Sequence, residues 1–336
     1  MKKAWYERLR HSTCAYIVFL FVLTGFSACS INKLVINKVS DTLSGSGANA
    51  VFLGDTDPKL VGDALPFAIK MYETLLDKNP NHSGLILTTG SLFVMYANAF
   101  VQGPAEMLPV EAYEEKRAGL DRAKKLYLRG AAILERDINS KYPALLSGED
   151  ADVEDATGDF AGKLAKINKE DVPLLYWYAA GTLSAYALNP FDISLGMRIP
   201  LLSALMERAY ELDGDFNAGA LDEFFLILYG SLPEGMGGDR EKALVHYQKA
   251  LEKSKGLSAG AYVAYAQTIA VAEQNYERFR FNLETALAID PAADPSNTLV
   301  NIINQHKARY LLEKAPELFV DFDEEAWDAN PGYGDE

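Results

Sequence analysis

Histidine, cysteine and acidic side chains are the residues from which catalytic or metal chemistry in this chain would have to come. The 336 residues include only four histidines and two cysteines, and His82, His246 and His306 lack the paired spacing that places two metal ligands on one helix. No Gly-x-Ser-x-Gly motif is present. The acidic run Glu149–Asp155 lacks the central glycine and the distant glutamate of a calcium loop, so we interpret it as a solvated insertion. We expect no metal, no cofactor and no catalytic residue.

The amino-acid composition indicates which classes of binding partner are improbable. The chain has 47 acidic and 32 basic residues and a net charge of −15. Such a balance argues against a nucleic-acid backbone or an anionic lipid surface as the main partner. Because 49% of the residues are hydrophobic, the chain can build a sizeable core.

One cysteine follows a targeting segment. Four basic residues precede the apolar run Cys14–Phe26, whose 13 residues are too few to span a bilayer, which takes about 20. The segment Phe26-Ser27-Ala28-Cys29 resembles a bacterial lipobox, with Phe26 where the motif usually has leucine. The resemblance implies lipidation of Cys29, so we expect a periplasmic protein whose only membrane attachment is that lipid. An ordinary cleaved signal and an uncleaved signal anchor are the alternatives.

The remainder divides into a tether, a folded domain and a tail. Residues 1–28 are the expected signal peptide, and residues 29–56 include a Ser-Gly stretch typical of a flexible tether. In residues 57–320, long apolar stretches are bounded by Pro, Gly or Asp, and none alternates with a period of two. This pattern predicts an all-α domain, followed by an acidic tail over 321–336.

A recurring spacing indicates internal repeats. A small or apolar residue is followed by a large one four positions later and a small or apolar one three positions after that, in most copies with a helix breaker beyond. The copies are Ala68-Tyr72-Leu75-Pro80, Ala123-Tyr127-Gly130, Leu202-Met206-Ala209-Gly214, Ala243-Tyr247-Ala250 and Phe279-Leu283-Ala286-Pro291. Three of their endings resemble the close of a tetratricopeptide repeat. We expect an irregular tetratricopeptide-like solenoid of helical hairpins, with the copies as second helices and Asn297–Lys314 as a C-terminal capping helix.

The expected first helices are apolar almost all round, so they cannot face water. They are Leu85–Val101, Leu174–Leu188, Leu221–Tyr229 and Ala261–Ala272. Their aromatic residues either fill a second core or line an apolar channel that binds a hydrophobic molecule. The candidate ligand-binding residues are Tyr96, Trp177, Tyr178, Phe225, Tyr229, Tyr262 and Tyr265. Small residues beside them, such as Gly90, Gly181 and Gly260, either leave space for a ligand or permit close helix packing.

Three segments carry a family resemblance. They are Leu174-Leu175-Tyr176-Trp177, Gly237-Gly238-Asp239, and the last helix with Asn301, Gln305 and Lys307-Ala308-Arg309. Over about residues 57–320 the chain resembles the T component (TatT) family, the tetratricopeptide-repeat lipoproteins associated with TRAP transporters. The resemblance implies a lipid-anchored helical protein that works beside a TRAP solute-binding protein and handles a hydrophobic ligand. Physically, the two glycines predict a loop that delivers Asp239 as a helix N-cap.

Two functions from different classes follow. The first is a TRAP component that binds or channels a hydrophobic ligand, and the second is a scaffold lipoprotein with a filled core that binds an envelope protein. An enzyme, the third alternative, would need a buried titratable pair within hydrogen-bonding distance. We also expect a homo-oligomer, with a trimer as the guess.

Overall fold

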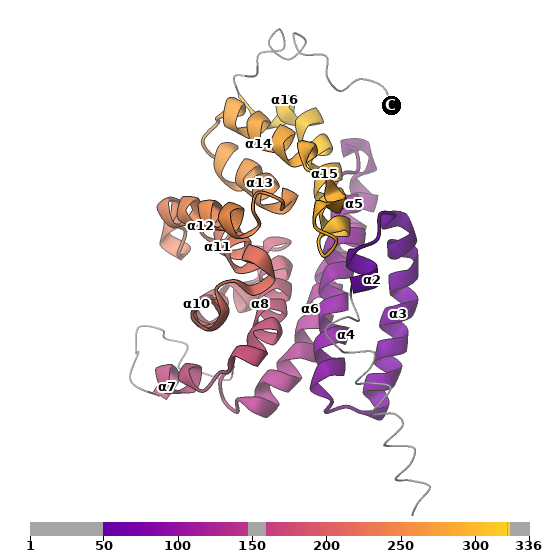
Figure 1. Cartoon of the computed structure of the whole chain (residues 1–336), viewed down its shortest axis with the longest axis vertical. Coiled ribbons are helices and arrows are strands. Elements are labelled where there is room, and N and C mark those ends of the chain that lie inside the picture. Colours follow the sequence, from indigo (N-terminus) through magenta and orange to yellow (C-terminus); the bar gives the residue numbers. More distant parts are fainter. Residues whose placement is uncertain (1–49, 147–158, 321, 323–336) are drawn as a thin grey trace, which may run out of the picture.

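The computed structural model describes residues 50–146, 159–320 and 322, and every regular element in these residues is a helix (Figure 1). The predicted all-α class is therefore confirmed. The expected signal peptide, Cys29, most of the tether, the acidic run and nearly all of the tail lie outside the described residues. Helix α2 (Ala50–Leu53) falls within the segment expected as a tether, and its Phe52 packs against the folded domain.

The N-terminal third is built on three long helices. In order, its elements are α3 (Pro58–Lys78), α4 (Ser83–Ala97), the π-helical η1 (Asn98–Gln102), α5 (Gly103–Glu106), η2 (Val110–Ala112) and α6 (Tyr113–Lys141). The side chain of Asp57 accepts a hydrogen bond from the Leu60 amide at 3.0 Å, with Pro58 at the first turn, so α3 has a strong start. Helix α4 packs between α3 and α6.

The middle third repeats this pairing of helices. Its elements are α7 (Asp159–Ala165), η3 (Lys169–Asp171), α8 (Val172–Ala187), α9 (Ile193–Gly196), α10 (Ile199–Asp213), η4 (Phe216–Gly219), α11 (Ala220–Ser231), η5 (Glu234–Met236) and α12 (Arg240–Lys253). Helix α8 packs on α6 and α10, and α11 packs on α12.

The loop before α12 forms as predicted. Gly237 has φ +96°, a Cβ on Gly238 would lie 1.9 Å from the Leu232 carbonyl oxygen, and Asp239 caps the helix by accepting from the Lys242 amide at 3.0 Å. Gly237 is therefore required for its backbone conformation, whereas Gly238 is required because there is no space for a side chain.

The C-terminal third ends in a helix with buried amides. Its elements are α13 (Ala259–Tyr265), the π-helical η6 (Ala266–Ala270), α14 (Tyr276–Ala288), η7 (Pro291–Ala293), α15 (Thr298–Glu313) and α16 (Ala315–Leu318). Gln305 donates to the carbonyls of Ala286 and Ile289 at 3.0 and 2.7 Å, which satisfies the end of α14. Asn301 accepts from the Ala259 amide at the start of α13 and is fully buried. These amides fasten α15 to the preceding pair of helices.

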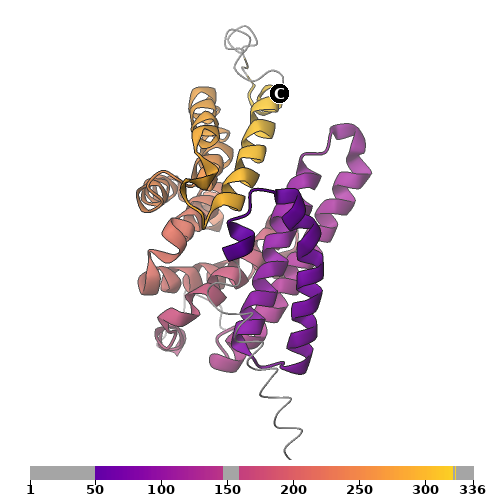
Figure 2. The same ribbon diagram turned by 45° about the vertical axis from the view of Figure 1, so that its right-hand side comes forward.

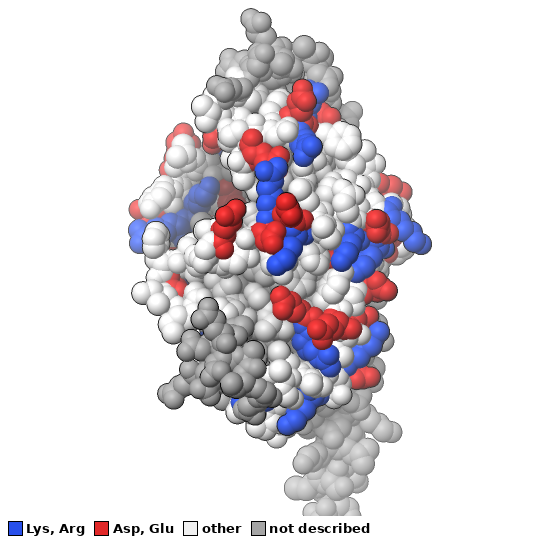
Figure 3. All heavy atoms as spheres, turned by 90° about the vertical axis from the view of Figure 1, so that its left-hand side faces the viewer, with Lys and Arg blue, Asp and Glu red and all other residues white. Residues whose placement is uncertain are grey.

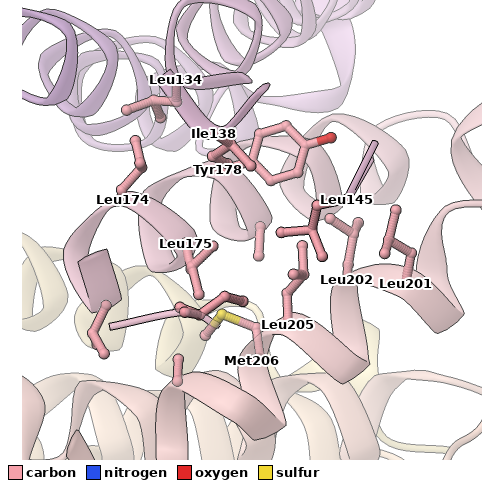
Figure 4. Packing of buried hydrophobic residues seen from close by; sticks show 14 of the residues in the cluster. Leu134, Ile138, Leu145, Leu174, Leu175, Tyr178, Leu201, Leu202, Leu205 and Met206 are labelled. Atoms are coloured by element: carbon pink, nitrogen blue, oxygen red, sulfur yellow. The ribbon is translucent and has the colours of Figure 1, made fainter. Parts of the chain in front are cut away.

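The repeated residues form the contacts between helices. The first and second positions of every copy are buried, and among the third positions only Leu75 is partly accessible. One large cluster of buried apolar side chains joins α6, α8, α10 and α11. Figure 4 shows Tyr178 beside Ile138 and, on the other side of the cluster, Leu205 and Met206 of α10.

Glycines permit close approach between helices. A Cβ on Gly130 of α6 would lie 2.8 Å from the carbonyl oxygen of Gly90 in α4, and one on Gly181 of α8 would lie 2.9 Å from Val94. At Gly90 and Gly181, close packing therefore accounts for the small residues. The stretch Ser83–Glu106 is long and apolar enough to cross a membrane, but 61% of its most apolar window is buried inside the fold, which is the behaviour of a core helix.

The last long helix, α15, contacts the first helices of the domain. Figures 1 and 2 both place α15 beside α2, and Leu299 and Ile303 of α15 join the cluster of α3 and α4. The Tyr310 hydroxyl donates to the Glu106 carbonyl oxygen at 3.0 Å, and Lys307 Nζ lies 3.9 Å from the Glu106 carboxylate. We call this contact of α15 with α2, α3 and α5 the seam. Through it, the helices form a closed circuit of packing contacts.

Candidate functional site

Three of the seven predicted ligand-binding residues are part of the packed core. Tyr178, Phe225 and Tyr265 are 1%, 2% and 4% exposed. The Tyr178 hydroxyl accepts a hydrogen bond from Arg198 at 3.1 Å, and burial raises the pKa of Tyr178 to about 12. Phe225 is stacked on His246, with ring centroids 4.9 Å apart. Side chains with so little accessible surface mainly fill space between helices.

The other four predicted residues keep part of their surface accessible. Tyr96 stacks on Phe100 at the end of α4, Trp177 packs edge-on against Tyr176, and Tyr229 and Tyr262 lie on α11 and α13. The structure does not gather the seven in one site, although Tyr178, Phe225, Trp177 and Tyr229 all belong to or pack against one core cluster. Phe225 and Tyr229 stack on each other at 5.5 Å, while Tyr262 and Tyr265 share a pocket.

The pocket of Tyr262 and Tyr265 has a volume of about 410 Å³ and lies between α12, α13 and α14. Polar groups surround its aromatic floor: the Tyr247 hydroxyl donates to Asn282 at 2.6 Å, and Arg278 donates to the Tyr265 hydroxyl at 3.2 Å. The exposed ring of Phe281 lies at its edge. This pocket is thus more polar than the channel expected from the sequence.

A buried acidic residue of α11 organises a second cluster. Asp222 is fully buried; it accepts from Tyr210 and Lys253 at 3.0 and 2.7 Å, and His246 Nδ1 lies 2.8 Å from the same carboxylate. Burial alone would raise the pKa of Asp222, but the hydrogen bonds from His246, Lys253 and Tyr210 outweigh it and lower the pKa. Both carboxylate oxygens are used, so the cluster serves chiefly to join α10, α11 and α12.

The Asp222–His246 pair is the kind of titratable pair that an enzyme would require. The rings of Phe225 and Tyr229 cover the imidazole by stacking at 4.9 and 5.9 Å, and Tyr210 contacts it edge-on. No serine, threonine or cysteine side chain hydrogen-bonds to this pair in the described residues. Within the same residues, no three His, Cys, Asp or Glu side chains are arranged to hold a metal ion.

The next residue of α11 has a different environment. Glu223 keeps some accessible surface, yet burial raises its pKa, with a further contribution from the charge of Asp222. Ser258, just before α13, donates to Glu223 Oε1. A Cβ on Gly260 would lie 2.7 Å from Glu223 Oε2 and 3.4 Å from Asn304 Nδ2 of α15. The absence of a side chain at Gly260 therefore lets the carboxylate sit against α13.

Tyr176 of α8 faces the same region. Burial raises the pKa of its hydroxyl, and the nearby charge of Glu223 raises it further. Its ring contacts Trp177 and Phe216 with centroids 5.2 and 5.3 Å away. We call Glu223, Ser258, Gly260, Asn304 and Tyr176 the Glu223 site. None of these residues was predicted as a site from the sequence, although two adjacent acidic residues on the otherwise apolar α11 were a signal for it.

Charges on the outer surface are mixed. On the face drawn in Figure 3, basic and acidic side chains alternate in small groups, and neither sign forms a continuous patch. Elsewhere in the domain, too, charges are paired along helices, as Lys70 with Glu73 in α3 and Arg208 with Glu211 in α10. This face therefore offers no strongly charged surface to a partner.

The described residues form an all-α domain with aromatic residues on several of its apolar helices. The model of one family, the TRAP transporter T-component, matches residues 54–319. The chain belongs to this family, which confirms the resemblance seen in the sequence. The chain is also 31% identical over 330 residues to an uncharacterized protein of Treponema pallidum (strain Nichols), an alignment that covers 93% of this chain and 100% of that protein.

Proposed function

We propose that this chain is the lipid-anchored periplasmic component of a TRAP-type transport system, in which it associates with a solute-binding protein and binds a hydrophobic ligand. Membership of the T-component family over residues 54–319 is the observation that carries the proposal. A transporter component needs no catalytic group of its own, and the polar cluster at Asp222 has a structural explanation.

The proposed architecture is a tetratricopeptide-like solenoid with α15 as its terminal helix. Successive packing of α3, α4, α6, α8 and α10, and then of α11 to α15, supports it. Aromatic residues that keep accessible surface on the first helices, among them Tyr96, Trp177 and Tyr262, support a ligand surface there. Copies of the chain assemble as a homo-oligomer in this proposal, with a trimer as the expected size.

Copurification from the native envelope tests the association. We expect the tagged full chain to retain a TRAP solute-binding protein after mild detergent extraction. Mass spectrometry of the organic extract should find an apolar molecule in stoichiometric amount. If the preparation contained neither a solute-binding protein nor an apolar molecule, the proposal would be contradicted.

The Cys29→Ser variant tests the anchor in the same preparation. We expect this variant to lose its lipid and to move from the membrane fraction to the soluble fraction, while helicity by circular dichroism stays unchanged. A variant that stays in the membrane would contradict lipid anchoring through Cys29.

The burial of Tyr178, Phe225 and Tyr265 favours a second candidate, a scaffold with a filled core that binds an envelope protein and no small molecule. Copurification distinguishes the two, because the scaffold would retain a protein partner and yield no apolar ligand.

A further inference from the structure

Glu223 differs from the buried carboxylates of the described domain because it has no cation beside it. Asp137 and Asp171 both form ion pairs with Lys141, at 3.0 and 2.6 Å, and Asp222 pairs with Lys253 at 2.7 Å. Among the described residues, the only hydrogen-bond partner of the Glu223 carboxylate is the neutral hydroxyl of Ser258. A ligand that covers this partly accessible carboxylate removes it from water, which is costly unless the ligand supplies a counter-charge.

The surroundings of Glu223 come from four helices. It lies on α11; Ser258 and Gly260 belong to the start of α13, Asn304 comes from α15 and Tyr176 from α8. Further aromatic rings adjoin Tyr176, since Trp177 and Phe216 both contact its ring. An acidic group among aromatic rings is the combination by which proteins recognise ammonium groups.

Resting on the proposed binding of a hydrophobic ligand, we propose that the Glu223 site selects a ligand with a cationic head, an amine or quaternary ammonium, attached to an apolar body. The Glu223 carboxylate pairs with the cation, Ser258 holds the carboxylate in place, and the ring of Tyr176 contacts the charge and the adjoining methylene groups. No bond is made or broken in this recognition.

Binding of three amphiphiles with the same ten-carbon chain tests the inference. The full chain, stripped of bound lipid, is titrated with decyltrimethylammonium, decanol or decanoate below micelle-forming concentrations. We expect wild type to bind the ammonium at least about 10-fold more tightly than decanol, since its charge is attracted to the Glu223 carboxylate and to the face of the Tyr176 ring, whereas decanol is neutral. Glu223→Gln should remove this preference while changing decanol affinity less than about 2-fold, because the apolar contacts stay.

Two further variants serve as control and as a second test. Glu252→Gln removes an exposed charge from α12 and should leave all three affinities unchanged. Gly260→Ala keeps the charge but places a methyl group against the carboxylate, so we expect it to weaken ammonium binding selectively. Circular dichroism and thermal unfolding establish that each variant is folded. If Glu223→Gln does not fold, Gly260→Ala decides the question.

The outcomes separate this inference from the proposed function. Equal binding of the ammonium and decanol, a preference for decanoate, or a preference unchanged in both Glu223→Gln and Gly260→Ala would overturn the cationic head and leave the hydrophobic ligand standing. Absence of binding by all three amphiphiles would overturn the hydrophobic ligand and this inference with it.

Discussion

At the scale of single residues, two neighbouring acids of α11 have opposite environments. Asp222 points into a network with Lys253 and His246 that lowers its pKa, whereas burial raises the pKa of Glu223. Adjacent positions on a helix point about 100° apart, so each side chain meets different neighbours. The order of the residues predicts the two acids but not their partners, which come from helices distant in the chain.

The raised pKa of Glu223 predicts how stability depends on pH. The usual pKa is 4.5, and the folded chain holds this proton more tightly than the unfolded chain. Between that value and the higher folded pKa the folded state binds more protons, so its stability falls as pH rises. Tyr176 and Asp222 are the titratable groups in its field. We expect the free energy of unfolding of Glu223→Gln, relative to wild type, to increase as pH rises from 4.5, because the variant has no carboxylate to ionise.

Urea unfolding at pH 4.5 and pH 8 measures this difference. Glu252→Gln is the matched control, for which the difference from wild type should be the same at both pH values. A constant difference for Glu223→Gln would contradict the raised pKa.

The Asp222 network predicts a large loss when one partner is removed. Asp222→Asn leaves the partly buried Lys253 with only the more distant carboxylate of Asp215, at 3.7 Å, which should lower the free energy of unfolding by about 3 kcal/mol. The double variant Asp222→Asn, Lys253→Met should recover part of this loss, as a double-mutant cycle by urea unfolding would measure. Because the pKa of Asp222 is lowered on folding, its contribution is present above the unfolded pKa and disappears as pH falls through the folded pKa. Equal losses in the single and double variants would contradict the pairing.

At the scale of elements, local signals predicted much of the fold. The helix stops at Asn79-Pro80 and Asp290-Pro291 and the N-cap at Asp239 need only neighbouring residues, and the structure has them. The buried amide of Gln305 could not be placed from the sequence, because its partners are carbonyl groups at the end of another helix. Aromatic residues present the same difficulty, since Tyr176 and Tyr178 differ in exposure only through the helices around them.

Close helix packing at glycine predicts opposite effects for one substitution at two positions. Gly130→Ala would bring a methyl group 2.8 Å from the Gly90 carbonyl oxygen, so we expect a loss of roughly 1–3 kcal/mol. Gly162→Ala in α7 meets no atom within 4 Å and should gain about 0.5–1 kcal/mol by helix propensity. Thermal unfolding of both variants measures the sign, and a gain at Gly130 would contradict close packing of α4 against α6.

At the scale of the whole molecule, the seam is the feature that no repeat pattern predicts. The spacing of Ala243, Tyr247 and Ala250 indicates which face of a helix packs on its neighbour, but not how far the array turns before its end. The hydrogen bond from the Tyr310 hydroxyl to the Glu106 carbonyl oxygen joins residues 204 positions apart in the sequence. Whether such an array closes depends on the sum of all its crossing angles, which is a property of the assembled helices.

The seam predicts a selective loosening of the last helix. Leu299→Ala should lower the free energy of unfolding by about 2–4 kcal/mol and speed hydrogen exchange in α15 and α2 before the remaining helices. Leu134→Ala, in the cluster of α6 and α8, should be as destabilising without this local effect. Hydrogen exchange with mass spectrometry distinguishes the two variants. If exchange in Leu299→Ala became faster in all helices alike, the prediction that the seam opens before the rest of the domain would be wrong.

The dependence of the seam on α15 also bears on biosynthesis. During translation the apolar flank of α3 and α4 is made early, while Leu299 and Ile303, which cover it, emerge near the end. A native contact between segments so distant in sequence forms late, because a long loop must close first. Nascent or prematurely terminated chains that lack α15 would therefore expose the apolar surface of α3 and α4 to solvent. We expect chaperones to bind such chains or proteases to degrade them.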